Sequence, residues 1–240
     1  MNKHSSVFML MLRGMLFPVL GVLALMAAVQ TVLFQFTLSR AEIYCLEELF
    51  YQSRISVICG IAFLLVTVWM GHLYRDAGGK QSLTLRRLSV SERSVFFWQA
   101  ICNIGCYLIF WAVQVGILLF LSRLFCLSAD AEAFTNQSVL LAFYRNSFLH
   151  AMLPLADIIF YVRNILLILT LGLSLAFNAL SSRHEQWAPE TFAVIAATFL
   201  LFPQPSNDEY HAVIFFPLLA GVLIATLWRT IPKGAAIYEK

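Results

Sequence analysis

Apolar residues gather into six long runs along this chain. The runs cover residues 14–37, 54–74, 95–122, 158–179, 188–203 and 212–229. Each comes close to the roughly 20 residues that a helix needs to cross the hydrocarbon core of a bilayer. The fifth run is the weakest, because it reaches that length only with Trp187 at the interface and Pro189 opening the helix. The pattern predicts an all-α, polytopic membrane protein with about six transmembrane helices.

Composition supports a membrane location and a single domain. Hydrophobic residues make up 60% of the 240 positions and charged residues 12%, with a mean hydropathy of +0.80. A soluble domain carries roughly 25% charged residues, so lipid must solvate part of this apolar surface. The first apolar run continues to Phe36 without a small-x-small cleavage site, which favours a retained span over a removed signal peptide. We therefore treat residues 1–240 as one transmembrane domain.

The distribution of basic residues predicts the orientation of the spans. With six spans and both termini cytoplasmic, 11 of the 16 Lys and Arg fall on the inner side: Lys3, Arg13, Arg75, Lys80, Arg86, Arg87, Arg93, Arg183, Arg229, Lys233 and Lys240. Cytoplasmic loops of membrane proteins carry this excess of positive charge. Acidic residues lean the opposite way. The chain is thus expected to be a multi-pass protein of the cell (inner, cytoplasmic) membrane.

Two predicted outer segments are longer than tight turns. Residues 123–157 mix charged and polar side chains with Phe and Leu, which indicates an amphipathic segment on the outer leaflet or a re-entrant one. Residues 38–53 have a similar but shorter pattern. A disulfide between Cys45 and Cys126, one in each segment, is left open by the sequence.

The inner loop between the second and third runs has a pattern of its own. Residues 82–98 are basic and partly apolar, and leucines alternate with Thr and Arg over the length of one short helix. Ser89 and Glu92 then match a capping box that starts the next helix. Two interpretations stand at this point. The loop is either a positively charged loop with snorkelling arginines, or a short helix that docks on a cytoplasmic partner.

The stretch from Thr84 to Arg93, followed by an aromatic start to the third span, resembles the corresponding segment of ABC-2-type permeases, the membrane subunits of bacterial ABC transporters. The resemblance implies a coupling helix seated in a groove of a separate ATP-binding cassette subunit, which would carry ATP and Mg, with no cofactor on this chain. It also implies a second permease subunit, of the same or a different chain. The implied docking residues are Leu83, Leu85, Arg86, Arg87, Leu88, Glu92 and Arg93. Unlike many such permeases, this chain has only about a dozen residues before its first span, and its larger outer segment follows the third span.

Polar residues within the spans are the other candidates for function. Gln99, Asn103 and Gln114 share one stripe of the third span. Such residues face other helices or a cavity, so they either line a pathway or interface or connect helices. Arg163 lies about a turn and a half inside the fourth span, where it would snorkel outward, pair with Asp157, or bind a phosphate or carboxylate of a substrate. The candidate lining residues are Gln99, Asn103, Gln114, Asn164 and Arg163.

Motifs for catalysis or metal binding are missing from the sequence, and the predicted spans contain no pair of carboxylates. Enzymatic activity on this chain is therefore not expected, and neither is a metal site. The sequence favours a permease subunit that moves a hydrophobic or amphipathic substrate (a peptide, a lipid or a drug), in the direction of export, in contact with lipid and without nucleic acid. The alternatives are a secondary carrier or channel, and a non-transporting membrane partner in a larger complex.

Overall fold

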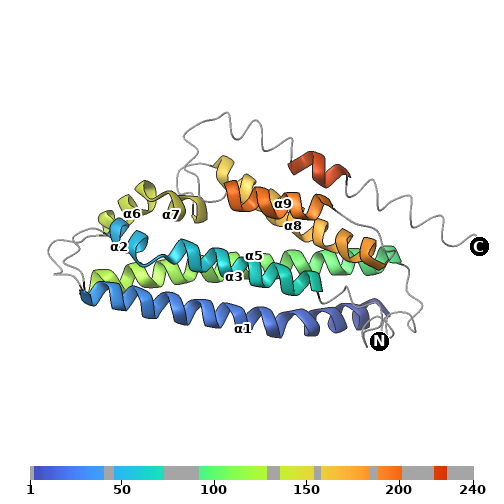
Figure 1. Cartoon of the computed structure of the whole chain (residues 1–240), viewed down its shortest axis with the longest axis horizontal. Coiled ribbons are helices and arrows are strands. Elements are labelled where there is room, and N and C mark those ends of the chain that lie inside the picture. The colour runs from blue at the N-terminus through green and yellow to red at the C-terminus, as the bar shows by residue number, and fades with distance from the viewer. Residues whose placement is uncertain are drawn as a thin grey trace, which may run out of the picture.

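A computed structural model gives a helical bundle (Figure 1). The structure describes residues 3–40, 46–72, 92–128, 136–153, 158–183, 189–201 and 219–225. Within them the helices are α1 (Lys3–Arg40), α2 (Leu46–Gln52), α3 (Ile55–His72), α5 (Glu92–Ser128), α6 (Asn136–Arg145), α7 (Ser147–Met152), α8 (Ile158–Arg183) and α9 (Pro189–Leu201), and residues 219–225 are also helical. These ranges contain no strand. The prediction of an all-α fold is confirmed for the described part of the chain.

Three helices contain stretches long and apolar enough to cross a membrane: Met11–Arg40, Ser94–Ser128 and Phe160–Ser181. The pair α2 and α3 meets the same criterion if it counts as one span broken by a bend of 48°. The structure describes 13 residues of α9, about 20 Å at the rise of an α-helix, and the residues on either side of them lie outside the described part of the chain. The protein is therefore embedded in a membrane, while the six-span count and the orientation stay predictions.

The long helices extend beyond the apolar runs. Helix α1 begins at Lys3, and α5 continues to Ser128 although its apolar run ends at residue 122. Polar residues such as Arg123 continue a helix readily when no Gly or Pro interrupts it. The first residues of the expected outer segment 123–157, up to Ser128, are therefore the last turns of α5, and its outer location stays a prediction.

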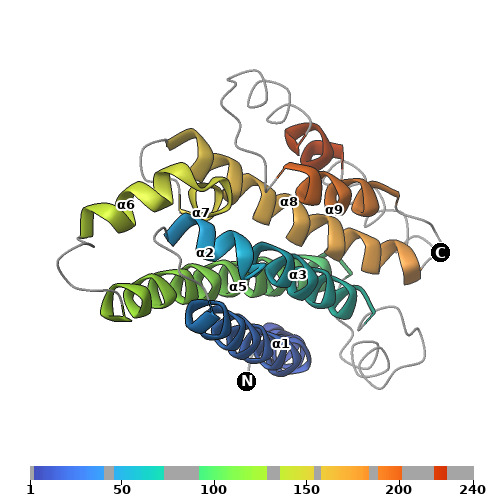
Figure 2. The same cartoon turned by 60° about the vertical axis from the view of Figure 1, so that its left-hand side comes forward.

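Long helices that follow one another in the sequence run in alternate directions, so α1 and α5 are parallel, and α5 lies at the centre of the bundle (Figures 1 and 2). It packs on α1 along one side and on α8 along the other, while α1 also packs on α3 and α8 on α9. One continuous apolar core joins these elements, with fully buried side chains such as Met15, Phe34, Val66 and Leu118. Apolar residues on the outer surface of α1, such as Phe17 and Leu25, remain exposed, as expected of a helix that contacts lipid.

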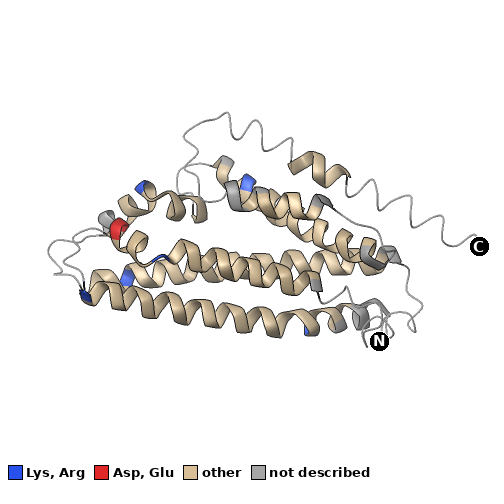
Figure 3. Ribbon diagram, in the orientation of Figure 1, with Lys and Arg blue, Asp and Glu red and all other residues tan. Residues whose placement is uncertain are grey.

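The short helices α2, α6 and α7 gather at one end of the bundle, near the C-terminal end of α1 (Figures 1 and 2). Helix α6 packs on both α2 and α7. Several described charges lie at this end, while a basic residue of α8 lies nearer the middle of the bundle (Figure 3). Arg145 of α6 lies 4.0 Å from Glu47 of α2, but both side chains are well exposed, so this ion pair adds little stability. Within the expected outer segment, residues 136–152 thus form a pair of short helices that covers this end of the bundle.

The bend between α2 and α3 has a local cause at Arg54. Its φ of 53° lies in the left-handed region, which ends a helix because the chain turns away from the helical path. The Ser53 hydroxyl donates to the Leu49 carbonyl at 2.7 Å, and the Val57 amide donates to the Arg54 carbonyl at 3.1 Å, where α3 begins. Backbone groups at the break are therefore satisfied although the helix is interrupted.

Candidate functional site

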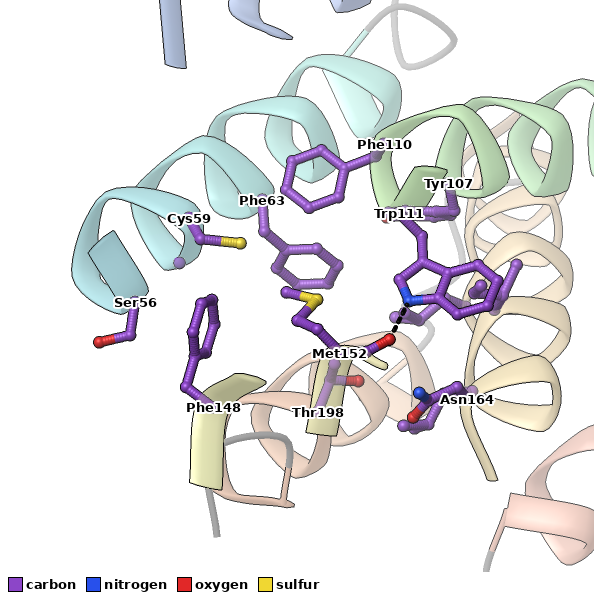
Figure 4. A pocket seen from close by; sticks show the side chains of 14 residues that line it. Ser56, Cys59, Phe63, Tyr107, Phe110, Trp111, Phe148, Met152, Asn164 and Thr198 are labelled. Atoms are coloured by element: carbon purple, nitrogen blue, oxygen red, sulfur yellow. Dashed lines mark hydrogen bonds between the residues drawn. The ribbon is translucent and has the colours of Figure 1, made fainter. Parts of the chain in front are cut away.

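A cavity of about 140 Å³ lies between α3, α5, α7, α8 and α9 (Figure 4). Its wall combines residues far apart in the sequence, and it is rich in aromatic side chains. The main apolar contributors are Cys59, Phe63, Phe110, Trp111, Phe148, Met152, Leu167, Ile168 and Leu171. A concave, mostly apolar space between helices is the usual setting of a ligand site in a helical bundle.

Polar groups in this wall are already occupied by partners inside the protein. The Tyr107 and Thr67 hydroxyls lie 2.9 Å apart, and the Thr198 hydroxyl donates to the Val194 carbonyl at 2.7 Å. The Trp111 indole and the Asn164 amide also bond to backbone carbonyls. Since these groups are paired, the wall offers a ligand mainly apolar surface.

Helix α7 closes one side of the cavity and is fixed at both of its ends. At its start, Asn146 accepts hydrogen bonds from the amides of Phe148 and Leu149 at 3.0 and 3.2 Å, as a typical N-cap does. At its end, the Ala151 carbonyl accepts from Asn164 Nδ2 at 2.8 Å and the Met152 carbonyl accepts from Trp111 Nε1 at 3.0 Å (Figure 4). The last carbonyls of a helix have no partner within it, so α5 and α8 supply the missing donors.

Replacing Trp111 by Phe is expected to loosen α7 without disturbing the spans. The substitution removes the donor to the Met152 carbonyl, and losing such a buried hydrogen bond costs about 1 kcal/mol. Hydrogen exchange of the amides in residues 147–153 should then accelerate about fivefold. Trp98→Phe is the matched control, because Trp98 also lies on α5 but packs on Phe8. Equal exchange in both variants would show that the indole does not hold α7.

The predicted polar stripe of α5 is buried, and two of its members, Asn103 and Gln114, bond to different helices. Gln99, Asn103 and Gln114 are all at most 2% exposed. Asn103 Nδ2 donates to the Gly172 carbonyl of α8 at 3.2 Å. Gln114 Oε1 accepts from Gln30 Nε2 of α1 at 3.2 Å. Hydrogen bonds between helices are therefore present on this stripe. None of its three residues belongs to the cavity wall as described. Their role as pathway or interface lining stays a prediction.

Arg163 lies on α8 beside the cavity. Only 8% of the residue is exposed. Its Nη2 donates to Asn164 Oδ1 at 3.4 Å, and its guanidinium lies 4.9 Å from the centre of the Phe160 ring. The Nε group is buried without a hydrogen-bond partner, and within the described ranges no carboxylate forms an ion pair with this residue. Asp157, the partner considered from the sequence, lies outside the described residues.

The predicted docking segment is mostly outside the part of the chain that the structure describes. This holds for Leu83, Leu85, Arg86, Arg87 and Leu88. Glu92 and Arg93 are the first two residues of α5, in agreement with a helix that starts at this point. The docking role of all seven residues remains a prediction.

Cys45 also lies outside the described residues, so a disulfide with Cys126 remains open. Among the described residues, no group of three His, Cys, Asp or Glu side chains is placed to hold a metal ion.

The sequence did not identify the cavity or the role of Trp111. A tryptophan inside an apolar run gives one signal, which is that its buried N–H needs an acceptor. The acceptor itself is 41 residues away in the sequence.

Comparisons with known protein families, with curated proteins and with solved structures found no match to this chain. The function must therefore be argued from the geometry and the sequence.

Proposed function

We propose that this chain is the membrane-spanning permease subunit of an ABC transporter. In this proposal it moves a hydrophobic or amphipathic substrate outward across the cell membrane. The energy comes from ATP hydrolysis on a separate ATP-binding subunit, and a second permease subunit completes the pathway. Six spans with both termini in the cytoplasm belong to the same proposal.

The observation that carries the proposal is the apolar, partly open cavity between α3, α5, α7, α8 and α9. Protein interiors are close-packed and have few voids larger than a water molecule, so a space of this size between the helices supports a role in binding or transport. The wall is apolar and aromatic, which matches a hydrophobic substrate. Helix α7 is short and is held by a few hydrogen bonds, so a modest change in α5 or α8 would open this side of the cavity.

The source of energy is argued from the charges. The stretches Met11–Arg40, Ser94–Ser128 and Phe160–Ser181 contain no Asp or Glu. Carriers driven by protons or sodium commonly use a carboxylate at membrane depth. A carrier mechanism is therefore less favoured than one in which a partner supplies the energy through the basic loop 82–93.

The test is purification of the tagged chain from its own host in mild detergent, followed by mass spectrometry of the bound proteins. We expect an ATP-binding subunit in stoichiometric amount. The purified complex, placed in vesicles, should then move a hydrophobic substrate only when ATP and Mg are present.

A catalytically dead variant of the ATP-binding subunit is the control for the transport assay. A chain that purifies alone, and whose transport follows an ion gradient instead of ATP, would replace this proposal by the secondary carrier. A complex with proteins other than an ATPase, and no flux of any kind, would favour the non-transporting partner.

A further inference from the structure

We propose that the cavity and Arg163 together form a binding site for an anionic amphiphile with a single hydrocarbon chain. In this site the carboxylate or phosphate of the ligand pairs with the Arg163 guanidinium, and part of the chain fills the apolar cavity. The positions of Arg163 and the cavity carry the binding part of the proposal. The statement that this ligand is the transported substrate rests on the proposed function.

The first argument is the charge of Arg163. A buried guanidinium without an anionic partner is costly, and Arg163 is only 8% exposed. Its described contacts, Phe160 and Asn164, are neutral, and its Nε remains unpaired. The planar fork of Arg matches carboxylate and phosphate groups. Among the described residues the guanidinium therefore has no anionic partner, and a bound anion would supply one.

The second argument is the place of Asn164 between the charge and the cavity. Its Oδ1 accepts from Arg163, its Nδ2 is held by the Ala151 carbonyl of α7, and its side chain is part of the cavity wall (Figure 4). The guanidinium is thus within hydrogen-bond distance of a residue that lines the apolar space. A ligand that satisfies both features must have a charged head joined directly to a hydrocarbon part.

The third argument is size. A volume of about 140 Å³ is close to that of an engineered apolar cavity of roughly 150 Å³ that binds benzene. Such a space takes a segment of one hydrocarbon chain or a single ring. The cavity is partly open, and the space that it offers matches one hydrocarbon chain, so a fatty acid or a single-chain phosphate is the class that fits best.

The test measures binding to the full-length chain purified in amphipol, without any ATPase. Radiolabelled dodecanoate and dodecyl phosphate are the anionic probes, dodecanol is the neutral probe, and dodecyltrimethylammonium is the cationic competitor. We expect saturable binding of at least one anion and no competition by the cation. The comparison of the two anions distinguishes a carboxylate ligand from a phosphate ligand.

Two substitutions separate the head from the chain. Arg163→Gln should weaken binding of the anions about tenfold or more, by removing a charge-assisted hydrogen bond, and should leave dodecanol unchanged. Arg163→Lys keeps the charge but loses the planar fork, so it should weaken binding of the anions less than Arg163→Gln does. Ile168→Trp, which fills the cavity, should weaken binding of anions and dodecanol alike.

Matched controls lie on the same elements. Arg123→Gln removes an exposed charge near the end of α5, and Ile165→Trp adds the same bulk at a position of α8 that is 50% exposed. Neither should change binding, and the thermal unfolding midpoint of every variant reports its folding. If Arg163→Gln does not fold, Arg163→Lys still tests the role of the Arg163 side chain, and Ile168→Trp still tests the role of the cavity.

Unchanged anion binding in Arg163→Gln, or equal competition by the cation, would overturn the role of Arg163. Unchanged binding in Ile168→Trp would overturn the cavity as the site of the chain. Either result leaves the permease proposal standing, because no ATPase enters the assay. Conversely, a chain that binds the anion but purifies without an ATP-binding subunit would keep this site and refute the proposed transporter.

Discussion

Replacing Leu85 and Leu88 together by Asp is expected to abolish ATP-driven transport while the helical bundle stays folded. Under the proposed function these leucines sit in an apolar groove of the ATP-binding subunit. Two carboxylates in that groove would lose their hydration without gaining partners, which costs at least several kcal/mol. The purified complex should then hydrolyse ATP without moving substrate, or lose its ATP-binding subunit altogether.

The measurement is transport into vesicles, read together with ATP hydrolysis and with the amount of bound partner. Gln81→Asp combined with Ser82→Asp is the matched control, since it adds the same two charges to the same loop just before the leucines. This control should retain most of the transport. Coupled transport at the wild-type rate in the leucine variant would rule out docking through this segment.

The helical class and the membrane location of this chain were predictable because both depend on local composition. A run of about 20 apolar residues leaves few options other than a spanning helix. Boundaries were less predictable. The apolar pattern marks where lipid contacts the chain, whereas the helix continues through polar residues such as those from Arg123 to Ser128 in α5.

The candidate site was predictable only in its polar members. Arg163 and Asn164 stood out because polar side chains are costly inside an apolar run. The cavity did not, since its wall extends in sequence from Ser56 to Thr198 and arises from the packing of five helices. Helix α7 is a similar case. Six residues are too few for a helix that is stable by itself, and in this protein Asn146 caps the start of α7 while Trp111 and Asn164 satisfy its last carbonyls.

Replacing Gly172 by Leu is expected to disrupt the packing of α5 against α8, the most extensive helix contact in the described part of the bundle. A Cβ at this position would lie 3.0 Å from the backbone nitrogen of Ile104 and 3.3 Å from its Cα. Backbone atoms cannot rotate away as a side chain does, so the two helices must separate. Small residues at helix contacts in membranes permit this close approach.

Separation of the helices would also break the hydrogen bond from Asn103 to the Gly172 carbonyl and the small cluster in which Phe96 and Ala100 pack on Ala176 and Phe177. Even Gly172→Ala should cost about 1–3 kcal/mol, the usual range for overpacking, and Leu should cost more. Gly105→Ala is the control: Gly105 is next to Ile104 on α5, and an added Cβ there meets nothing within 4 Å. That control should be neutral or stabilising, because Ala favours a helix by about 1 kcal/mol over Gly. Denaturation of the three variants in mixed micelles measures the change in their free energy of unfolding. A Gly172→Ala protein as stable as the wild type would mean that α5 and α8 do not approach this closely.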